Sequence, residues 1–220
     1  MHHPHIIGLS GPAGSGKDTI AGILVECAGF TQLAFADTLR TEVMLAFAID
    51  PSFLTQRETK EMPLRCLAIG RCLDEGFVAR MIVMHTLNSE RLDLDAPRSP
   101  RQIMQWWGTD YRRQQQHDYW VSGLLKRAHY LVDQNPGIRI VVTDCRFQDE
   151  VDAVRFVTER SQIWQVWREG VAIAPGAHVS EVTGYEFRPD VLIRNCTSLK
   201  RLHARVMEAW ADGLGAGQGA

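Results

Sequence analysis

The sequence lacks any long apolar run: among its 220 residues, no stretch approaches the roughly 18 apolar residues of a membrane span. It also lacks an apolar segment of secretory length ahead of its first charged motif. Its net charge of -2 provides no global positive field of the kind that marks many nucleic-acid-binding proteins. We therefore expect neither a secreted nor a membrane protein, and nucleic acid is a disfavoured partner.

Cysteine and lysine are both scarce. The five cysteines form no C-x-x-C pair and no close cluster with histidine, which excludes a disulfide framework and a zinc site. Such scattered thiols are typical of a reduced, cytoplasmic protein. Only four of the 24 basic residues are lysine, and the rest are arginine, which suits bidentate binding of phosphate or carboxylate. GC-rich coding is an equally good explanation of this bias on composition alone.

The composition itself is that of a globular chain, with 45% hydrophobic and 23% charged residues. Its length suits one sizeable α/β domain, with or without a lid. The chain opens with an apolar strand over 5–10, a glycine-rich turn, a helix over 18–29, a strand over 31–36 and a helix over 38–49. Such alternation predicts a parallel α/β sheet.

Hydrophobic spacing and turn residues divide the rest of the chain. We predict further helices over 101–107 (ended by Gly108), 118–132, 148–159 and 198–210, strands over 138–142, 163–167 and 191–193, and a frayed tail from 213. The stretch 50–100 is broken by prolines and glycine. It is interpreted as an insertion of helices and loops at the edge of the sheet, with one helix over 77–87.

The strongest motif is Gly11-x-x-x-x-Gly16-Lys17, set between a predicted strand and a predicted helix. Glycines in such a loop let consecutive backbone N–H groups surround phosphate oxygens, and the helix N-terminus adds its positive dipole end. Lys17 is then expected to reach the β- and γ-phosphates of a nucleoside triphosphate. Asp18 follows where Ser or Thr normally offers Mg²⁺ a hydroxyl, so Asp18 or Thr19 is expected to serve the ion.

Asp144 and Arg146 follow the β-branched strand over 138–142, at the edge where open α/β sheets place their ligands. Asp144 is a candidate for organising Mg²⁺, and capping of the following helix is the alternative. Arg146 is a candidate for binding a phosphate or a transition-state oxygen. A surface ion pair with Asp149 or Glu150 is the alternative for Arg146.

A third group of candidates surrounds a pair of adjacent tryptophans. Arg101 and Gln105 lie four residues apart on a predicted helix and share one face, which suits joint binding of a phosphate and a base edge. The tryptophans are interpreted as core residues, and they cannot face the same way on a helix. Arg112 and Arg113 are either binding residues or part of a solvated, charged turn.

Five segments of the sequence occur in an informative order. They are Leu9-Ser10-Gly11 through Gly16-Lys17-Asp18-Thr19, Arg101-Gln102-Ile103-Met104-Gln105 with Gly108-Thr109-Asp110, Tyr119-Trp120-Val121, Thr143-Asp144-Cys145-Arg146 with Asp149-Glu150, and His178-Val179-Ser180-Glu181. Together they resemble the deoxynucleoside monophosphate kinases of bacteriophages, over nearly the whole chain. The Gly-Lys-Asp-Thr variant of the loop and the Asp-x-Arg strand end are the more specific parts.

The resemblance implies an α/β, three-layer P-loop kinase fold with a parallel central sheet, a helical substrate-binding insertion and a lid. A single kinase domain would fill 1–220, with its core over about 5–49 and 137–212, the helical region over about 50–134 and the lid over about 168–190. The implied reaction is phosphoryl transfer from ATP, with Mg²⁺, to a deoxynucleoside 5′-monophosphate (dNMP). A homodimer, located in the host cytoplasm if a phage encodes it, is also implied.

Site residues follow from the resemblance position by position. The ATP phosphates are assigned to Gly11, Gly14, Ser15, Gly16, Lys17, Asp18, Thr19 and Arg168. Catalysis is assigned to Lys17, Asp18, Arg40, Asp144 and Arg146, with Asp18 and Asp144 as the metal ligands. Substrate binding is assigned to Asp37, Arg101, Gln105, Thr109 and Arg112. The lid contributes His178 and Glu181.

The accepted base is not predicted, because 50–100 matches the family poorly. Ala13 and Gly14 also stand where some relatives carry basic residues. Three alternatives stay open: a kinase acting on a modified base hydroxyl in phage DNA, a P-loop nucleotide-binding switch without an acceptor, and a kinase with a non-nucleotide phosphate acceptor, as in phosphomevalonate kinases.

Overall fold

The computed structural model describes residues 3–55, 59–171 and 188–216, and it divides into two compact units. The sheet unit comprises Met1–Phe35 and Val121–Ala220, and the helical unit comprises Ala36–Trp120. Both junctions fall upstream of the boundaries expected from the sequence. At the first junction, the helix that begins at Ala36 packs with other helices of the helical unit.

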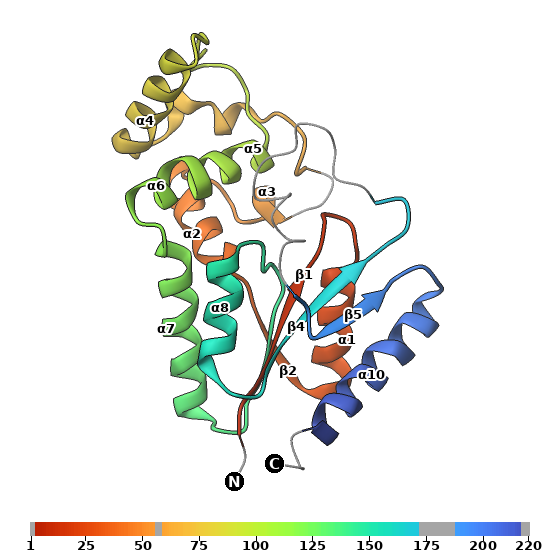
Figure 1. Cartoon of the computed structure of the whole chain (residues 1–220). Helices are drawn as coiled ribbons and strands as arrows, with labels where there is room; N and C mark the ends of the chain where they lie inside the picture. Colours follow the sequence, from red (N-terminus) through yellow and green to blue (C-terminus); the bar gives the residue numbers. More distant parts are fainter. Residues whose placement is uncertain (1–2, 56–58, 172–187, 217–220) are drawn as a thin grey trace. The chain divides into compact units, whose positions relative to one another are not determined.

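A five-stranded sheet forms the centre of the sheet unit (Figure 1). Its strands are β1 (His5–Ser10), β2 (Phe30–Leu33), β3 (Arg139–Val142), β4 (Ser161–Trp167) and β5 (Val191–Arg194). Their order is β2-β3-β1-β4-β5, and every neighbouring pair is parallel. The predicted parallel α/β sheet is confirmed, and the carboxyl ends of all five strands therefore meet at one edge.

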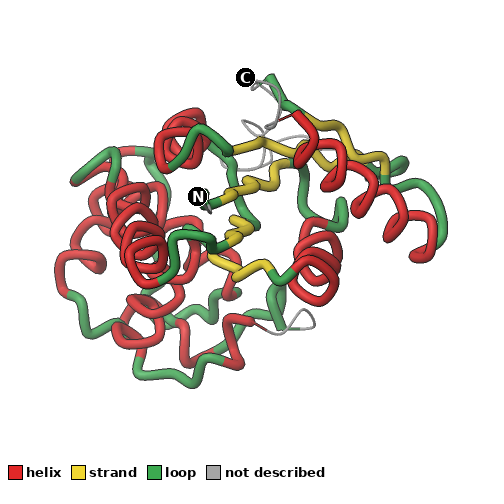
Figure 2. Tube along the Cα trace, turned by 90° about the horizontal axis from the view of Figure 1, so that it is seen from below, coloured by secondary structure: helices red, strands yellow, loops and turns green. Residues whose placement is uncertain are grey.

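Helices cover both faces of this sheet (Figure 2). They are α1 (Lys17–Ala28), α8 (Gln148–Val157) and α10 (Leu199–Ala216), together with the part of α7 (Tyr119–Gln134) that follows Trp120. Ile7 and Leu9 of β1 lie in a buried cluster with side chains of α1 and α10. Gly8 points to the opposite face, where a Cβ would lie only 2.8 Å from the Cys145 sulfur, so the packing there leaves room for glycine alone.

The helical unit contains α2 (Ala36–Phe47), α3 (Ser52–Thr55), η1 (Arg65–Leu67), η2 (Ile69–Arg71), α4 (Glu75–Leu87), α5 (Pro100–Gln105), η3 (Trp106–Arg112) and α6 (Arg113–Gln115). Its core is aromatic. The buried Phe77 ring contacts Phe47, Trp107 and Tyr111, with the Trp107 ring centroid 4.7 Å away. Aromatic side chains bury large apolar areas, so this cluster stabilises the helical unit.

Two expected helix ends are wrong. Gly108 does not terminate the helix that follows Ser99; the chain continues through it as a π-helix, η3. Glycine disfavours a helix by only about 1 kcal/mol, and burial of Trp107 and Tyr111 on either side outweighs that. Likewise α10 runs to Ala216 instead of fraying at Gly213, and its residues Leu202, Val206 and Trp210 pack in the core of the sheet unit.

Across the described part of the chain, no helix has both the length and the apolar character that crossing a bilayer requires.

Candidate functional site

The glycine-rich loop lies between β1 and α1, at the carboxyl edge of the sheet. Gly11, Gly14 and Gly16 have φ angles of 130°, 78° and 105°, a region that side chains with a Cβ rarely adopt. Gly11 is constrained a second time, since a Cβ there would lie 2.4 Å from the carbonyl oxygen of Val166 in β4. The three glycines therefore let the backbone curl tightly over the sheet edge, as a phosphate-binding loop requires.

Polar groups gather inside this loop. The Lys17 Nζ donates to the carbonyl oxygens of Gly11 and Pro12, at 2.7 and 2.9 Å. The hydroxyls of Ser10 and Ser15 are buried and have no hydrogen-bond partner among the residues that the structure describes. A buried hydroxyl without a partner is costly, and donation to a phosphate oxygen would satisfy it.

Asp144 and Arg146 lie beside the loop because β3 is the neighbour of β1. The Cys145 N–H donates to the Leu9 carbonyl oxygen, which ties the end of β3 to the end of β1. An Asp144 carboxylate oxygen accepts from the Phe35 backbone N–H at 2.8 Å. This hydrogen bond aligns the end of β2 with the same edge, so Asp144 is held by the sheet.

The N-terminus of α8 is capped by Glu150. The buried Glu150 carboxylate accepts from the backbone N–H groups of Arg146 and Phe147, at 2.7 and 3.1 Å. Glu150 thereby shapes the turn that carries Arg146. The sequence offered a signal for this role, since an acidic residue in the first turn of a helix often accepts from its free N–H groups.

Cys145, between Asp144 and Arg146 in the sequence, has a buried thiol. The charged groups that act on this thiol show which side chains lie near it. Burial raises the pKa of the Cys145 thiol well above its ordinary value, and the carboxylates of Glu150 and Asp144 raise it further, while the Lys17 ammonium opposes them. Lys17 and Asp144 are therefore near enough to act on one sulfur atom. The thiol itself stays neutral and serves as packing, not as a nucleophile.

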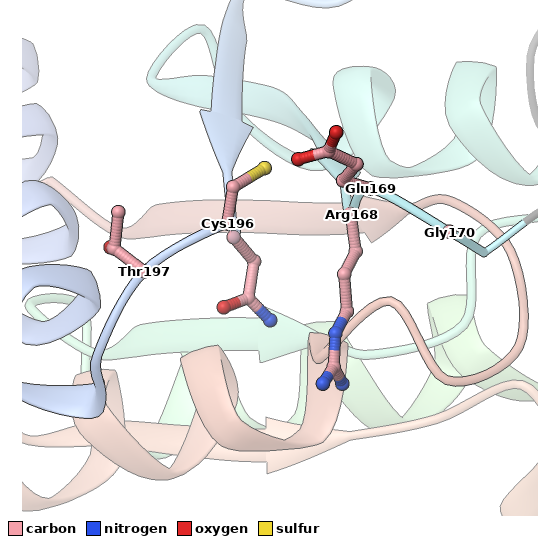
Figure 3. A pocket seen from close by; sticks show the side chains of 6 residues that line it. Arg168, Glu169, Gly170, Cys196 and Thr197 are labelled. Carbon is pink, nitrogen blue, oxygen red and sulfur yellow. The ribbon is translucent and has the colours of Figure 1, made fainter.

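A cavity of about 400 Å³ opens where β4 and β5 end (Figure 3). Arg168, Glu169 and Gly170 line it from one segment, and Asn195, Cys196 and Thr197 from the other. Figure 3 shows the side chains of Arg168 and Glu169 pointing in opposite directions. Arg168 donates to the Gly14 carbonyl oxygen of the loop at 3.3 Å. This contact places the cavity beside the glycine-rich loop.

The Asn195 side chain also contacts the loop, with its amide donating to the Ser15 carbonyl oxygen at 2.8 Å. Sequence reasoning missed this residue, because a lone asparagine after a short strand carries no pattern.

In the helical unit, several predicted site residues form ion pairs. Arg40 pairs with Asp37 at 2.8 Å, one turn away on α2, so two predicted residues lie together. Arg101 pairs with the exposed carboxylate of Glu61. Both arginines remain partly exposed, and such surface pairs exchange readily for a ligand's phosphate.

Arg112 is held more tightly than its predicted substrate role would suggest. Its Nε donates to Glu42 at 2.8 Å, and its guanidinium lies over the rings of Tyr111, Trp107 and Tyr119. Glu42, another residue that sequence reasoning missed, also accepts from the Trp107 indole N–H and the Tyr119 hydroxyl. Arg112 is thus engaged in the internal structure of the helical unit.

The predicted residues separate into two groups. The sheet unit holds Gly11, Gly14, Ser15, Gly16, Lys17, Asp18, Thr19, Asp144, Arg146 and Arg168. The helical unit holds Asp37, Arg40, Arg101, Gln105, Thr109 and Arg112. His178 and Glu181, assigned to the lid, lie outside the described residues.

Two carboxylates of the sheet unit are candidates for holding Mg²⁺. No group of three or more histidine, cysteine, aspartate or glutamate side chains suited to a metal occurs in the described ranges. Mg²⁺ does not need one, because it is commonly held by one or two carboxylates, phosphate oxygens and waters. Asp18, exposed on the first turn of α1, and Asp144 fit that limited requirement.

Comparison with known proteins identifies two viral proteins whose sequences are similar to this chain. A putative deoxynucleotide monophosphate kinase of Acanthamoeba polyphaga mimivirus is 26% identical over 213 residues, covering 92% of this chain and 94% of the relative. The chain is similar to viral proteins that are named as deoxynucleotide kinases. The deoxynucleoside-5′-monophosphate kinase of Escherichia phage T5 is 24% identical over 181 residues, 68% of this chain and 71% of the relative. The resemblance expected from the sequence motifs is confirmed.

No protein-family model matches the sequence. Among solved structures, an unliganded sugar kinase from Janibacter sp. HTCC2649 is similar over 96% of this chain and 95% of its own, with a TM-score of 0.47 and 14% identity.

Proposed function

We propose that this protein transfers the γ-phosphoryl group of ATP to a deoxynucleoside 5′-monophosphate, giving ADP and the diphosphate. The observation that carries the proposal is the glycine loop with Lys17 at the carboxyl edge of a parallel sheet, beside Asp144 and Arg146. The names of the mimivirus and phage T5 relatives support the choice of acceptor.

The donor side is assigned to the sheet unit. Backbone N–H groups of the loop, the two buried serine hydroxyls and Lys17 would bind the phosphates, and the cavity beside Arg168 would take the base. Asp18 and Asp144 would hold Mg²⁺, which when bound neutralises charge on the β- and γ-phosphates. The acceptor side is assigned to the helical unit, with Arg40, Arg101, Gln105 and Thr109 as its binding residues.

The chemistry needs no covalent intermediate. An oxygen of the monophosphate forms a bond to the γ-phosphorus as the bond to the bridging oxygen of ATP breaks, and ADP leaves with that electron pair. The attacking oxygen is already anionic, so no strong base is required. The work of the protein is positioning and charge neutralisation, which explains a site rich in arginine and backbone N–H groups.

The alternatives weighed from the sequence are not favoured by these relatives, neither of which is named as a DNA-modifying enzyme or a nucleotide switch. Action in the cytoplasm, of the host if a phage encodes the protein, is part of the proposal. A homodimer stays a prediction, and light scattering of the purified protein tests it.

The decisive experiment incubates the protein with ATP, Mg²⁺ and each dNMP in turn, including 5-substituted pyrimidines, and separates the products by chromatography. A diphosphate product from at least one base is expected. If no base yields a diphosphate, the proposed acceptor is wrong.

A matched pair of variants tests the loop. Lys17→Ala is expected to abolish turnover while preserving the circular dichroism spectrum, because the lysine acts on phosphate and not on the core. Lys126→Ala, at an exposed position on α7, should behave as wild type. Full activity in Lys17→Ala would remove the loop from the mechanism.

A further inference from the structure

The side chain of Asn195 joins the loop after β5 to the phosphate-binding loop. Its amide donates to the Ser15 carbonyl oxygen at 2.8 Å, while its own backbone N–H donates to the Trp167 carbonyl oxygen at 2.7 Å. The second bond anchors Asn195 to the end of β4. The half-buried side chain is therefore fixed at its base by the sheet and at its tip by the phosphate-binding loop.

The same amide also limits what can occupy the loop. A Cβ built at Gly16 would lie 2.3 Å from the Asn195 Nδ2, so Asn195 occupies the space that any larger residue would need. Gly16 immediately precedes Lys17 and the N-terminus of α1. Asn195 thus packs against the part of the loop whose backbone N–H groups are expected to face phosphate.

Asn195 also lines the cavity beside the loop. It is in contact with both halves of the donor site: the cavity on one side and the Ser15–Gly16 backbone on the other. An aliphatic residue of similar size would fill the space but leave the Ser15 carbonyl oxygen without this donor. A carboxylate at this position would place an acceptor oxygen against the Ser15 carbonyl oxygen, which is also an acceptor. It would also add a negative charge near the phosphates.

We propose that Asn195 is a positioning residue that holds the Ser15–Gly16 backbone in its phosphate-binding conformation. The inference rests on the proposed function, in which this loop binds the phosphates of ATP. Its effect is on the phosphate groups and not on the base, although the residue lines the cavity. Loss of the amide should therefore weaken binding of any triphosphate, with or without a nucleoside.

The test compares Asn195→Ala and the isosteric Asn195→Asp with wild type by titration calorimetry, using a non-hydrolysable ATP analogue and inorganic triphosphate as separate ligands with Mg²⁺. Loss of one hydrogen bond predicts about fivefold weaker binding for Asn195→Ala. The added repulsion predicts about thirtyfold or more for Asn195→Asp. Both ligands should weaken by the same factor.

Steady-state kinetics separates positioning from general damage. The KM for ATP should rise in both variants, while the KM for the accepted dNMP stays within about twofold, since the acceptor residues lie in the other unit. Asn88→Ala, at an exposed position in the helical unit, is the matched control and should change neither constant. Thermal denaturation of each variant establishes that it is folded.

Unchanged triphosphate binding in both variants would overturn the inference and leave Asn195 as a base-cavity residue. An equal rise in both KM values, with a lower melting temperature, would also overturn it and mark a purely structural role. If wild type binds triphosphate but phosphorylates no dNMP, the proposed function fails and the calorimetric test of Asn195 still stands.

Discussion

Replacing Glu42 tests how the helical unit is held together. The Glu42 carboxylate accepts from three side chains: the Trp107 indole at 2.8 Å, the Arg112 guanidinium at 2.8 Å and the Tyr119 hydroxyl. The side chains of Glu42 and Arg112 are only 17% and 21% exposed, so water replaces little of what is lost. Glu42→Ala leaves a largely buried guanidinium and two other donors without this acceptor.

The size of the effect follows from these contacts. Removing one partner of a buried ion pair costs about 3–5 kcal/mol, and each orphaned donor adds about 1 kcal/mol. Residual exposure and the second acidic neighbour of Arg112, Asp74 at 3.7 Å, reduce the total. We expect Glu42→Ala to lower the free energy of unfolding by about 3 kcal/mol. Glu42→Gln should cost about 1 kcal/mol, since its oxygen can still accept.

Urea denaturation followed by tryptophan fluorescence measures the change, because Trp107 belongs to the network. Glu61→Gln removes the charge of an ion-pair partner that is 66% exposed, and it should stay within about 0.5 kcal/mol of wild type. The hydrogen bond to Glu42 and burial raise the pKa of Tyr119, so Glu42→Ala should also bring this pKa back toward its ordinary value in an ultraviolet titration. If Glu42→Ala is no less stable than Glu61→Gln, the carboxylate does not hold the unit together.

Three further results are expected. Gly11→Ala forces a methyl group toward the Val166 carbonyl oxygen 2.4 Å away, so calorimetric ATP binding should be lost, whereas Gly22→Ala, with nothing within 4 Å, should bind normally. Arg146→Ala should lower kcat about 10³-fold. An unchanged kcat would favour the alternative role of Arg146, a surface ion pair. Burial raises the pKa of Cys72 from 9.0 to about 11, so its contribution to stability is complete below pH 9 and lost as pH rises to about 11. Cys72→Ser should flatten that part of the stability profile measured by urea denaturation, and an unaltered slope would contradict the assignment.

Much of the sheet unit was predictable because its signals are local. A strand, a glycine loop and an amphipathic helix follow one another within 5–29, and each glycine of the loop is required by backbone geometry at its own position. The position of Asp144 and Arg146 at the carboxyl edge of the sheet was predictable for a similar reason, because a buried parallel strand ends just before them. Once β1 and β3 pair, their carboxyl ends share one edge.

The helical unit was less predictable, because its contacts join distant positions. Gly108 marks a helix end by local propensity, yet burial of the neighbouring aromatic rings carries the chain through it as a π-helix. Arg112 has the sequence character of a phosphate-binding residue. Only the fold shows that its guanidinium donates to Glu42, a residue on another helix.

The sequence by itself therefore determined the parallel α/β class, the glycine-rich loop and the similarity to deoxynucleotide kinases, since these depend on residues that are adjacent along the chain. Only the tertiary structure decided which charged side chains pair with each other inside a unit, as Glu42 and Arg112 do. It also decided which side chain forms a hydrogen bond to the glycine-rich loop. Asn195 and Ser15 are separated by almost the whole chain, and their hydrogen bond exists only because β5 and β1 flank β4 in one sheet.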